Sequence, residues 1–171
     1  MTESAKIIFS LLLAAVFMSS GPAGSAENSS SLYKKGAALA LAGKYEESSL
    51  VFKQVIDMSP HYCLGHYGLG KVYLYKYGML DQAAIHLSKA VELDRRFSKG
   101  YFYLGLAYML SHKYTAALHA FDLCFRYDQT YMEALFNMSI IYDIMGNDYK
   151  AAIYYKRYSK LKAGDEEFLF Q

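Results

Sequence analysis

The chain of 171 residues contains no tryptophan, only two prolines and only two cysteines. Proline breaks the hydrogen-bond ladder of a helix, so its scarcity permits long helices. The two cysteines, Cys63 and Cys124, are too few for a disulfide framework, and we expect both to be buried free thiols. The net charge of +2 lacks the concentrated basic field that nucleic-acid binding requires. These shortages argue against a disulfide scaffold and against a nucleic-acid-binding protein.

Apolar residues and tyrosine are abundant instead. Hydrophobic residues make up 54% of the chain and charged residues 20%, which favours a packed core over intrinsic disorder. The 18 tyrosines each combine a large apolar ring with one polar group, so they suit half-buried surfaces and interfaces. The length fits a single domain.

The N-terminal residues resemble an export signal. Lys6 precedes an apolar run over residues 7–18 that only Ser10 interrupts. A run of this length is too short to span a bilayer, which takes about 20 apolar residues, but it fits the apolar region of a secretory signal peptide. Gly24 and Ala26 stand at positions −3 and −1 of a cleavage site after Ala26. We therefore predict a signal peptide over residues 1–26 and an exported protein, periplasmic or secreted if the source is bacterial. The alternative is an uncleaved segment that tethers the chain to a membrane.

The rest of the chain repeats itself at intervals of 34 or 35 residues. Small residues recur in two columns and large apolar residues in two others. These columns are Gly36, Gly70, Gly105 and Ser139; Ser48, Ala83, Ala117 and Ala151; Phe52, Leu87, Phe121 and Tyr155; and Leu39, Tyr73, Tyr108 and Tyr142. The spacing is 34 residues except for one extra residue between Tyr73 and Ala83, near Gly78.

Each repeat unit reads as two helices joined by a short turn. Small residues at two points let the helices approach closely, and large apolar residues fill the space beside them. The first helix of a unit should stop at Gly43, Gly78, His112 or Gly146. The register predicts units over residues 29–62, 63–97, 98–131 and 132–162, and a C-terminal tail over residues 163–171.

This pattern resembles the tetratricopeptide repeat family. The second unit carries Leu69, Gly70, Tyr73, Gly78, Ala83 and Ala90, and the third carries Tyr101, Leu104, Gly105, Tyr108, Ala117 and Phe121. The fourth unit diverges, since Met138 and Ser139 replace the Leu-Gly pair. The resemblance implies an all-α, right-handed superhelical solenoid of about four repeats, with the first helix of each unit on the concave side. It also implies a binding scaffold for other proteins and not an enzyme.

The inward positions of these first helices predict a partner-binding groove. An aromatic column stands three residues before the glycine column and a mixed column one residue after it, and further along lie Leu41, Tyr75, Leu110 and Ile144. The candidate residues are Tyr33, Tyr67, Phe102 and Phe136, together with Lys71, Leu106, Ile140, Tyr75 and Lys99. Rigid aromatic rings make good anchors for an extended peptide or a partner helix. The alternative is that these rings pack on neighbouring repeats and expose little surface.

The carboxylate clamp of the family's chaperone-tail binders is absent, because Tyr33 and Ala37 stand where its first Lys and Asn would be. Lys71 and Lys99 could still meet an acidic group of a ligand.

The sequence predicts no cofactor, no metal and no catalytic residue. Residues 65–71 follow the spacing of a phosphate-binding loop, but Val72 replaces the required Ser or Thr. His61, Cys63 and His66 cluster without a standard spacing or a fourth ligand.

The C-terminal unit ends without an evident polar cap. Its last helix carries Tyr154, Tyr155 and Tyr158, and the tail ends in an apolar run over residues 168–170. An open apolar edge invites self-association, although the tail could fold back to cover it. We therefore expect an exported adaptor for another protein, in cell-envelope, pilus or secretion assembly. The alternative is a structural subunit that forms a homodimer or larger assembly through this edge.

Overall fold

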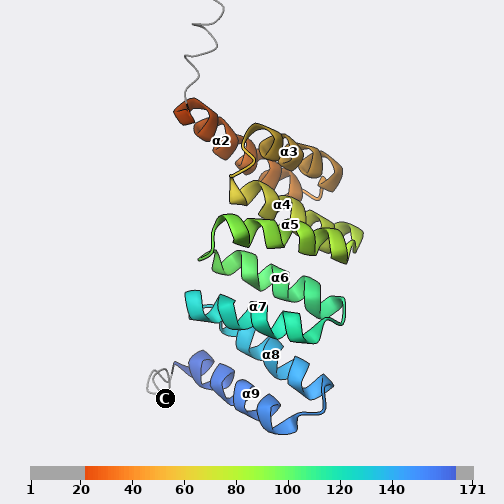
Figure 1. The fold of residues 1–171 in the computed structure, drawn as a ribbon, viewed down its shortest axis with the longest axis vertical. Helices are drawn as coiled ribbons and strands as arrows, with labels where there is room; N and C mark the ends of the chain where they lie inside the picture. Colours follow the sequence, from red (N-terminus) through yellow and green to blue (C-terminus); the bar gives the residue numbers. More distant parts are fainter. Residues whose placement is uncertain (1–21, 165–171) are drawn as a thin grey trace, which may run out of the picture.

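The computed structural model describes residues 22–164, with side chains from residue 28 onward, as a stack of antiparallel helix pairs (Figure 1). The pairs are α2 (Pro22–Leu41) with α3 (Tyr45–Met58), α4 (Cys63–Val72) and its continuation η1 (Tyr73–Tyr77) with α5 (Leu80–Leu93), α6 (Ser98–Leu110) with α7 (Tyr114–Tyr127), and α8 (Met132–Ile144) with α9 (Asp148–Ala163). We call α2, α4, α6 and α8 the A helices and their partners the B helices. The described residues contain no strand, so the predicted all-α repeat architecture is confirmed.

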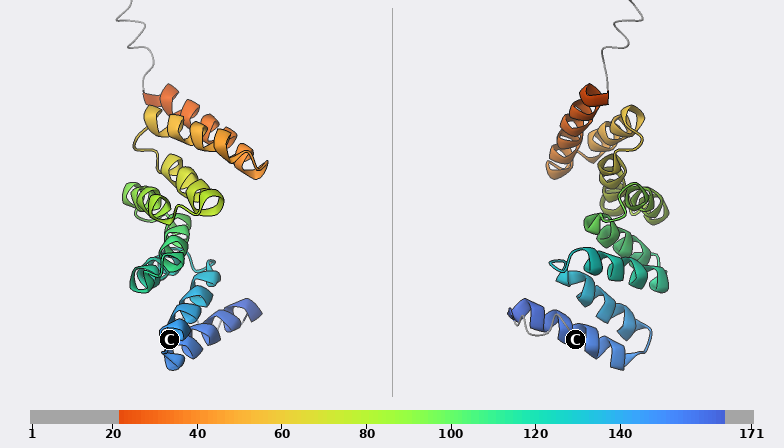
Figure 2. Two further views of the ribbon diagram at one scale, coloured as in Figure 1. Left: turned by 90° about the vertical axis from the view of Figure 1, so that its right-hand side faces the viewer. Right: turned by 60° about the vertical axis from the view of Figure 1, so that its left-hand side comes forward.

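Most of the predicted signal peptide and of the C-terminal tail falls on residues 1–21 and 165–171, which lie outside the described part of the chain. Consecutive pairs stack in one direction, so that α2 and α9 lie at opposite ends of the array (Figures 1 and 2). None of the helices within residues 22–164 is both long enough and apolar enough to cross a membrane.

The turn inside each pair uses a residue with left-handed backbone. Gly43, Gly78 and Gly146 have φ angles of 76°, 59° and 72°, in the region that glycine adopts without steric cost. His112 occupies the equivalent place in the third pair with φ 58°, and its Nδ1 lies 2.9 Å from the hydroxyl of Tyr114. The four turn positions predicted from the sequence are therefore confirmed.

A π-helical turn absorbs the extra residue of the second unit. In three pairs, a carbonyl near the end of the A helix accepts a hydrogen bond from the N–H five residues later: Leu39 from Lys44, Tyr108 from Lys113, and Tyr142 from Asn147. The equivalent carbonyl of Tyr73 accepts from Gly78, five residues later, and also from Met79, six residues later, at 3.1 Å. The π-helical segment η1 begins at Tyr73. Such single π turns occur inside α-helices where one residue is inserted.

A large side chain from each of the first three B helices fills the space that a glycine leaves on an A helix. A Cβ atom at Gly105 would lie 2.7 Å from the ring of Phe121, and a Cβ at Gly70 would lie 2.7 Å from Leu87. The ring of Phe52 touches two A helices at once, since Cβ atoms at Gly36 and Gly68 would lie 2.8 Å and 2.4 Å from it. These contacts explain the glycine column, because any side chain there would push the helices apart.

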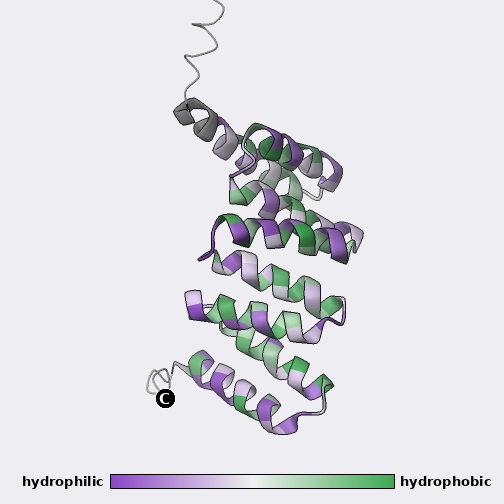
Figure 3. Cartoon of the chain, in the orientation of Figure 1, coloured by the Kyte–Doolittle hydropathy of each residue, from purple (hydrophilic) through white to green (hydrophobic). Residues whose placement is uncertain are grey.

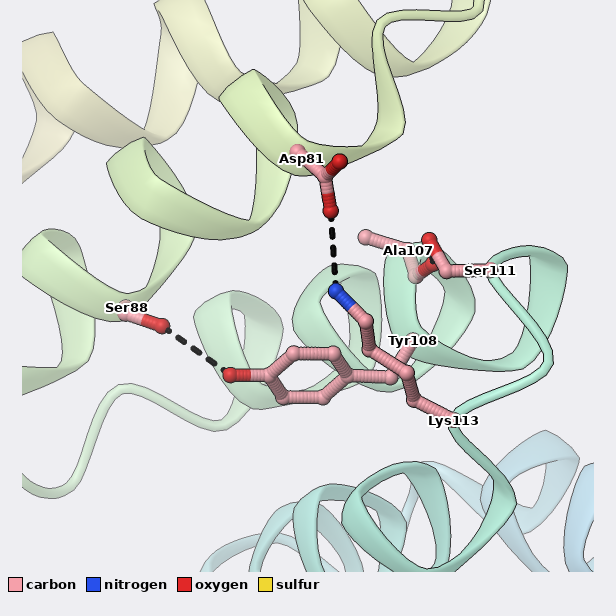
Figure 4. A network of polar contacts seen from close by, with 6 residues as sticks. All are labelled: Asp81, Ser88, Ala107, Tyr108, Ser111 and Lys113. Carbon is pink, nitrogen blue, oxygen red and sulfur yellow. Dashed lines mark hydrogen bonds and ion pairs between the residues drawn. The ribbon is translucent and has the colours of Figure 1, made fainter.

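The apolar core runs along the stack, and polar contacts link neighbouring pairs at its surface. Figure 3 shows α6 and α8 with few hydrophilic residues, whereas α9 carries many. Between the second and third pairs, Lys113 Nζ lies 2.8 Å from a carboxylate oxygen of Asp81 (Figure 4). The hydroxyls of Ser88 and Tyr108 lie 3.5 Å apart in the same region. These contacts fix the second pair against the third.

Gly105→Ala tests the close approach of the A and B helices. Alanine raises helix propensity by about 1 kcal/mol, whereas overpacking against the buried Phe121 ring costs about 1–3 kcal/mol. We expect a net loss in the free energy of unfolding, measured by urea denaturation. Phe121→Leu should lower the free energy of unfolding by less in the Gly105→Ala variant than in the wild type. The control is Ser139→Ala, which places the same residue at the equivalent site of the fourth pair, where a Cβ already fits. An equal effect of both alanines would contradict this packing.

Candidate partner-binding groove

A cavity of about 510 Å³ opens between α2 and α4, with α3 beneath it. Its lining comprises Tyr33, Ala37, Ala40, Leu41, Tyr45, Phe52, Tyr67, Gly68, Lys71, Val72 and Tyr75. The floor is the ring of Phe52, held in place by its contacts with Gly36 and Gly68. The volume lies within the range of ligand-binding pockets, about 300–1,000 Å³. We call this site the N-terminal cavity. It brings together four residues predicted for the groove, namely Tyr33, Tyr67, Lys71 and Tyr75.

Each A helix, with η1 counted as the end of α4, also presents one large, exposed apolar side chain near its C-terminal end. These residues stand five places after the glycine column, and their exposed fractions are 91% for Leu41, 61% for Tyr75, 51% for Leu110 and 54% for Ile144. We call this set the exposed apolar column. Single exposed apolar residues are ordinary, but one at the same position of all four repeats makes this column a candidate binding surface.

The predicted aromatic column is more buried than the exposed apolar column beside it. Tyr67 is only 7% exposed, because its ring packs edge-on against Phe97, the residue before α6, with centroids 4.9 Å apart, and against Tyr103 of the next unit at 5.6 Å. Phe102 lies between Phe121 and Tyr131, at centroid distances of 5.8 Å and 5.6 Å. Only Phe136, in the last unit, is exposed. Because neighbouring rings cover most of the aromatic column, it mainly supports the groove and provides little of its surface.

Lys71 is the only charged residue that lines the N-terminal cavity. Its Nζ lies 4.5 Å from the ring centroid of Tyr103 and 5.4 Å from that of Tyr67, which holds the cation over two aromatic faces. No carboxylate within residues 28–164 lies at ion-pair distance from it. A ligand carboxylate could therefore pair with Lys71 without displacing a native partner.

Lys99 is exposed in the first turn of α6 and already has a carboxylate nearby. The pKa of Asp128 is lowered, mainly by hydrogen bonds from Thr130 and to a smaller extent by Ser98 and the charge of Lys99. Leu106, in the same helix, is half-buried against the core. Neither residue lines the cavity, and both lie in the third unit, between the two ends of the groove.

Tyr103 joins several groove residues and was not among the predicted ones. Its ring centroid lies 5.6 Å from Tyr67, 6.0 Å from Tyr75 and 5.6 Å from Phe102. Burial is the main cause that raises the pKa of Tyr67 and of Tyr75, and Tyr103 is the next cause for both. The residues at the equivalent positions are Lys34, Gly68 and Asn137, so no repeating pattern marks this site in the sequence.

The opposite end of the groove is acidic. A shallow hollow of about 370 Å³ between α8 and α9 is lined by Phe136, Ser139, Ile140, Asp143, Asp148, Ala151, Ala152 and Tyr155. We call it the C-terminal hollow. It brings the predicted residues Phe136 and Ile140 beside two exposed carboxylates. The groove therefore has a cation at its N-terminal end and acids at its C-terminal end, which would orient a bound segment.

The last B helix leaves apolar side chains uncovered. None of the residues of α9 is fully buried, and Tyr149, Ile153 and Tyr155 are exposed, Tyr149 by 78%. Within the described residues, α9 lies at the end of the stack and packs mainly against α8, while its Arg157 also lies over the ring of Phe125 on α7 (Figure 1). This face is the edge that the sequence predicts to be open.

Comparisons with known proteins place the array among helical repeats. The sequence profile of the tetratricopeptide repeat family matches residues 29–62. The structure of MamA residues 41-end from Desulfovibrio magneticus RS-1 is 22% identical, with a TM-score of 0.73 over 81% of this chain and 77% of that one.

The first tetratricopeptide domain of Spaghetti (RPAP3), solved bound to the HSP90 peptide SRMEEVD, is 20% identical. Its TM-score is 0.67 over 70% of this chain and 94% of that domain. Anaphase-promoting complex subunit 3 of Schizosaccharomyces pombe is 30% identical over 110 residues, which are 64% of this chain. The match spans only 16% of the length of that subunit, and the structural likenesses show the fold alone.

A histidine pair outside the groove joins the two helices of the second unit. The Nδ1 atoms of His66 on α4 and His86 on α5 lie 3.1 Å apart. His61, which the sequence groups with His66 and Cys63, is exposed, and residues 22–164 contain no group of three metal-ligating side chains. Burial lowers the pKa of both paired histidines, and for His86 the charges of His66 and Lys53 lower it further.

The histidine pair predicts a loss of stability in acid. A base with a lowered pKa in the folded state binds more protons when unfolded, so its contribution is fully present above the unfolded pKa of about 6.5. That contribution disappears as the pH falls through 6.5 toward the folded pKa values. We expect the free energy of unfolding to be smaller at pH 5.5 than at pH 7.5, by urea denaturation. In the double variant His66→Gln, His86→Gln, the free energy of unfolding should depend less on pH. An unchanged pH dependence would contradict its assignment to this histidine pair.

Proposed function

Since the chain belongs to the tetratricopeptide repeat family, we propose that it is an adaptor that holds a segment of another protein in the groove along its A helices. The observation that carries this proposal is the exposed apolar column, which ends beside the N-terminal cavity. The Spaghetti domain, which has a similar fold, was solved bound to an HSP90 peptide, and this supports peptide binding as the use of the fold here. Because Tyr33 and Ala37 replace the clamp residues, the recognition would depend on apolar anchors more than on a carboxylate clamp.

The geometry suits an extended segment or a helix that lies across successive units. Leu41 and Tyr75 flank the cavity, so one anchor side chain of the partner would enter between them. Leu110 and Ile144 offer further apolar contacts along the groove. Full burial of one large apolar side chain contributes about 1.5–3 kcal/mol, so a few such anchors suffice for a specific complex. Their positions on helices keep the surface rigid and reduce the entropy lost on binding.

The proposal places this adaptor outside the cytoplasm, in cell-envelope, pilus or secretion assembly. Its support is the apolar run over residues 7–18 and the small residues before Glu27. The measurement is the mass of the protein recovered from the exported fraction. Cleavage after Ala26 predicts a chain that starts at Glu27, whereas a chain that keeps residues 1–26 would contradict a cleaved signal.

The second candidate function is a structural subunit that assembles through the face of α9. The specific observation is the exposure of Tyr149, Ile153 and Tyr155 at the end of the stack. A second copy that packed on this face would bury these side chains as each unit buries those of its neighbour. In that case the N-terminal cavity would stay free for another partner.

Charge placed on the exposed apolar column tests the adaptor function. We expect Leu110→Asp, Ile144→Asp to reduce partner capture from a native envelope extract by about tenfold or more, since it removes two apolar contacts worth about 1 kcal/mol or more each. The matched control is Leu50→Asp, Ile85→Asp, which charges two residues of similar exposure on the B helices α3 and α5. Circular dichroism verifies the fold of both variants. Equal capture by the two variants would argue against the groove.

A further inference from the structure

We propose that residues 165–171 of a second copy of the chain occupy the N-terminal cavity. The apolar residues 168–170 would enter the cavity, and the acidic residues 165–167 would pair with Lys71. This inference rests on the proposed function, in which the groove binds protein segments, and names one such segment.

The N-terminal cavity defines the chemistry of its occupant. Ten of its eleven lining residues are uncharged, and most of them present rings or aliphatic groups. Leu41 on its rim is 91% exposed, so an apolar occupant would remove a large apolar area from water. The remaining residue, Lys71, is half-buried over two tyrosine rings and lacks an acidic partner among the side chains of residues 28–164. The fitting segment is therefore apolar with a carboxylate next to it.

Residues 165–171 have this composition. Their sequence is Asp-Glu-Glu-Phe-Leu-Phe-Gln, with three consecutive carboxylates directly before three consecutive large apolar residues. The described chain ends with Gly164, whose φ of 81° terminates α9, so the segment follows directly from the last helix. Two apolar rings and an acidic group on one short segment match the cavity and its single cation in both hydrophobicity and charge.

The arrangement of the array favours the cavity of a second copy over that of the same copy. α9 lies at the opposite end of the stack from α2 and α4, with four helices between α9 and α4 (Figures 1 and 2). Seven fully extended residues reach at most about 25 Å. The nearest hollow of the same copy, the C-terminal hollow, contains Asp143 and Asp148, and these carboxylates repel residues 165–167. Occupancy in a second copy is a head-to-tail contact, which links copies into rings or filaments.

Sedimentation velocity of the full-length protein over a wide range of concentration tests the inference. We expect the wild type to self-associate and Phe168→Asp, Phe170→Asp to weaken that association by about tenfold or more. Lys71→Glu should weaken it similarly, and Glu166→Lys, Glu167→Lys should restore it when combined with Lys71→Glu. Two controls should leave it unchanged: Lys35→Glu, an exposed lysine of α2 outside the cavity, and Tyr149→Asp on the face of α9.

Three results would overturn the inference. The wild type could be a monomer at every concentration, its self-association could survive Lys71→Glu, or Tyr149→Asp could abolish that self-association. The last result would instead support assembly through the face of α9. Partner capture separates this inference from the proposed function. If self-association is absent but partner capture still depends on Leu110 and Ile144, only the proposed binding of residues 165–171 in the N-terminal cavity fails. If partner capture is also independent of Leu110 and Ile144, the proposed function fails as well.

Discussion

The contact between a B-helix side chain and an A-helix glycine determines how closely the helices of this protein approach. Phe52 shows the constraint most clearly, since its ring packs against Gly36 of its own unit and Gly68 of the next. The ring thereby sets both the angle within one pair and the distance between two pairs. The same ring is the floor of the N-terminal cavity, so the contact that stabilises the stack also shapes the surface available to a partner.

Stacking leaves one side of each A helix without a neighbour. The A helices α6 and α8 carry few hydrophilic residues, whereas the B helices α3, α5 and α7 have one apolar and one polar side (Figure 3). A surface helix normally turns polar residues to water, and a helix that is apolar on every side is normally buried. The exposed apolar column therefore costs solvation free energy in the isolated protein, and a bound segment would recover it. The single cation at one end and the two carboxylates at the other would give that segment a direction.

Repetition decides which features the sequence could predict. The helix pairs, the four turns and the position of the extra residue each follow from columns spaced by 34 or 35 residues, and His112 was placed correctly because its column contains three glycines. The exposure of side chains along the groove did not follow from the columns, since the burial of Tyr67 depends on Phe97 in the loop before α6 and on Tyr103 of the next unit. Tyr103 and the contact of His66 with His86 occur once in the array, so no periodic signal marks them.

Site-specific photo-crosslinking tests the central claim, that partners bind along the A helices, most directly. A photoreactive amino acid at Leu110 samples the exposed apolar column, and one at Ile85 samples the outer face of α5 at similar exposure. The account predicts that a bound partner, or a second copy of the chain, forms a covalent product with the residue at position 110 and not with the one at position 85. A product at position 85 alone would contradict it.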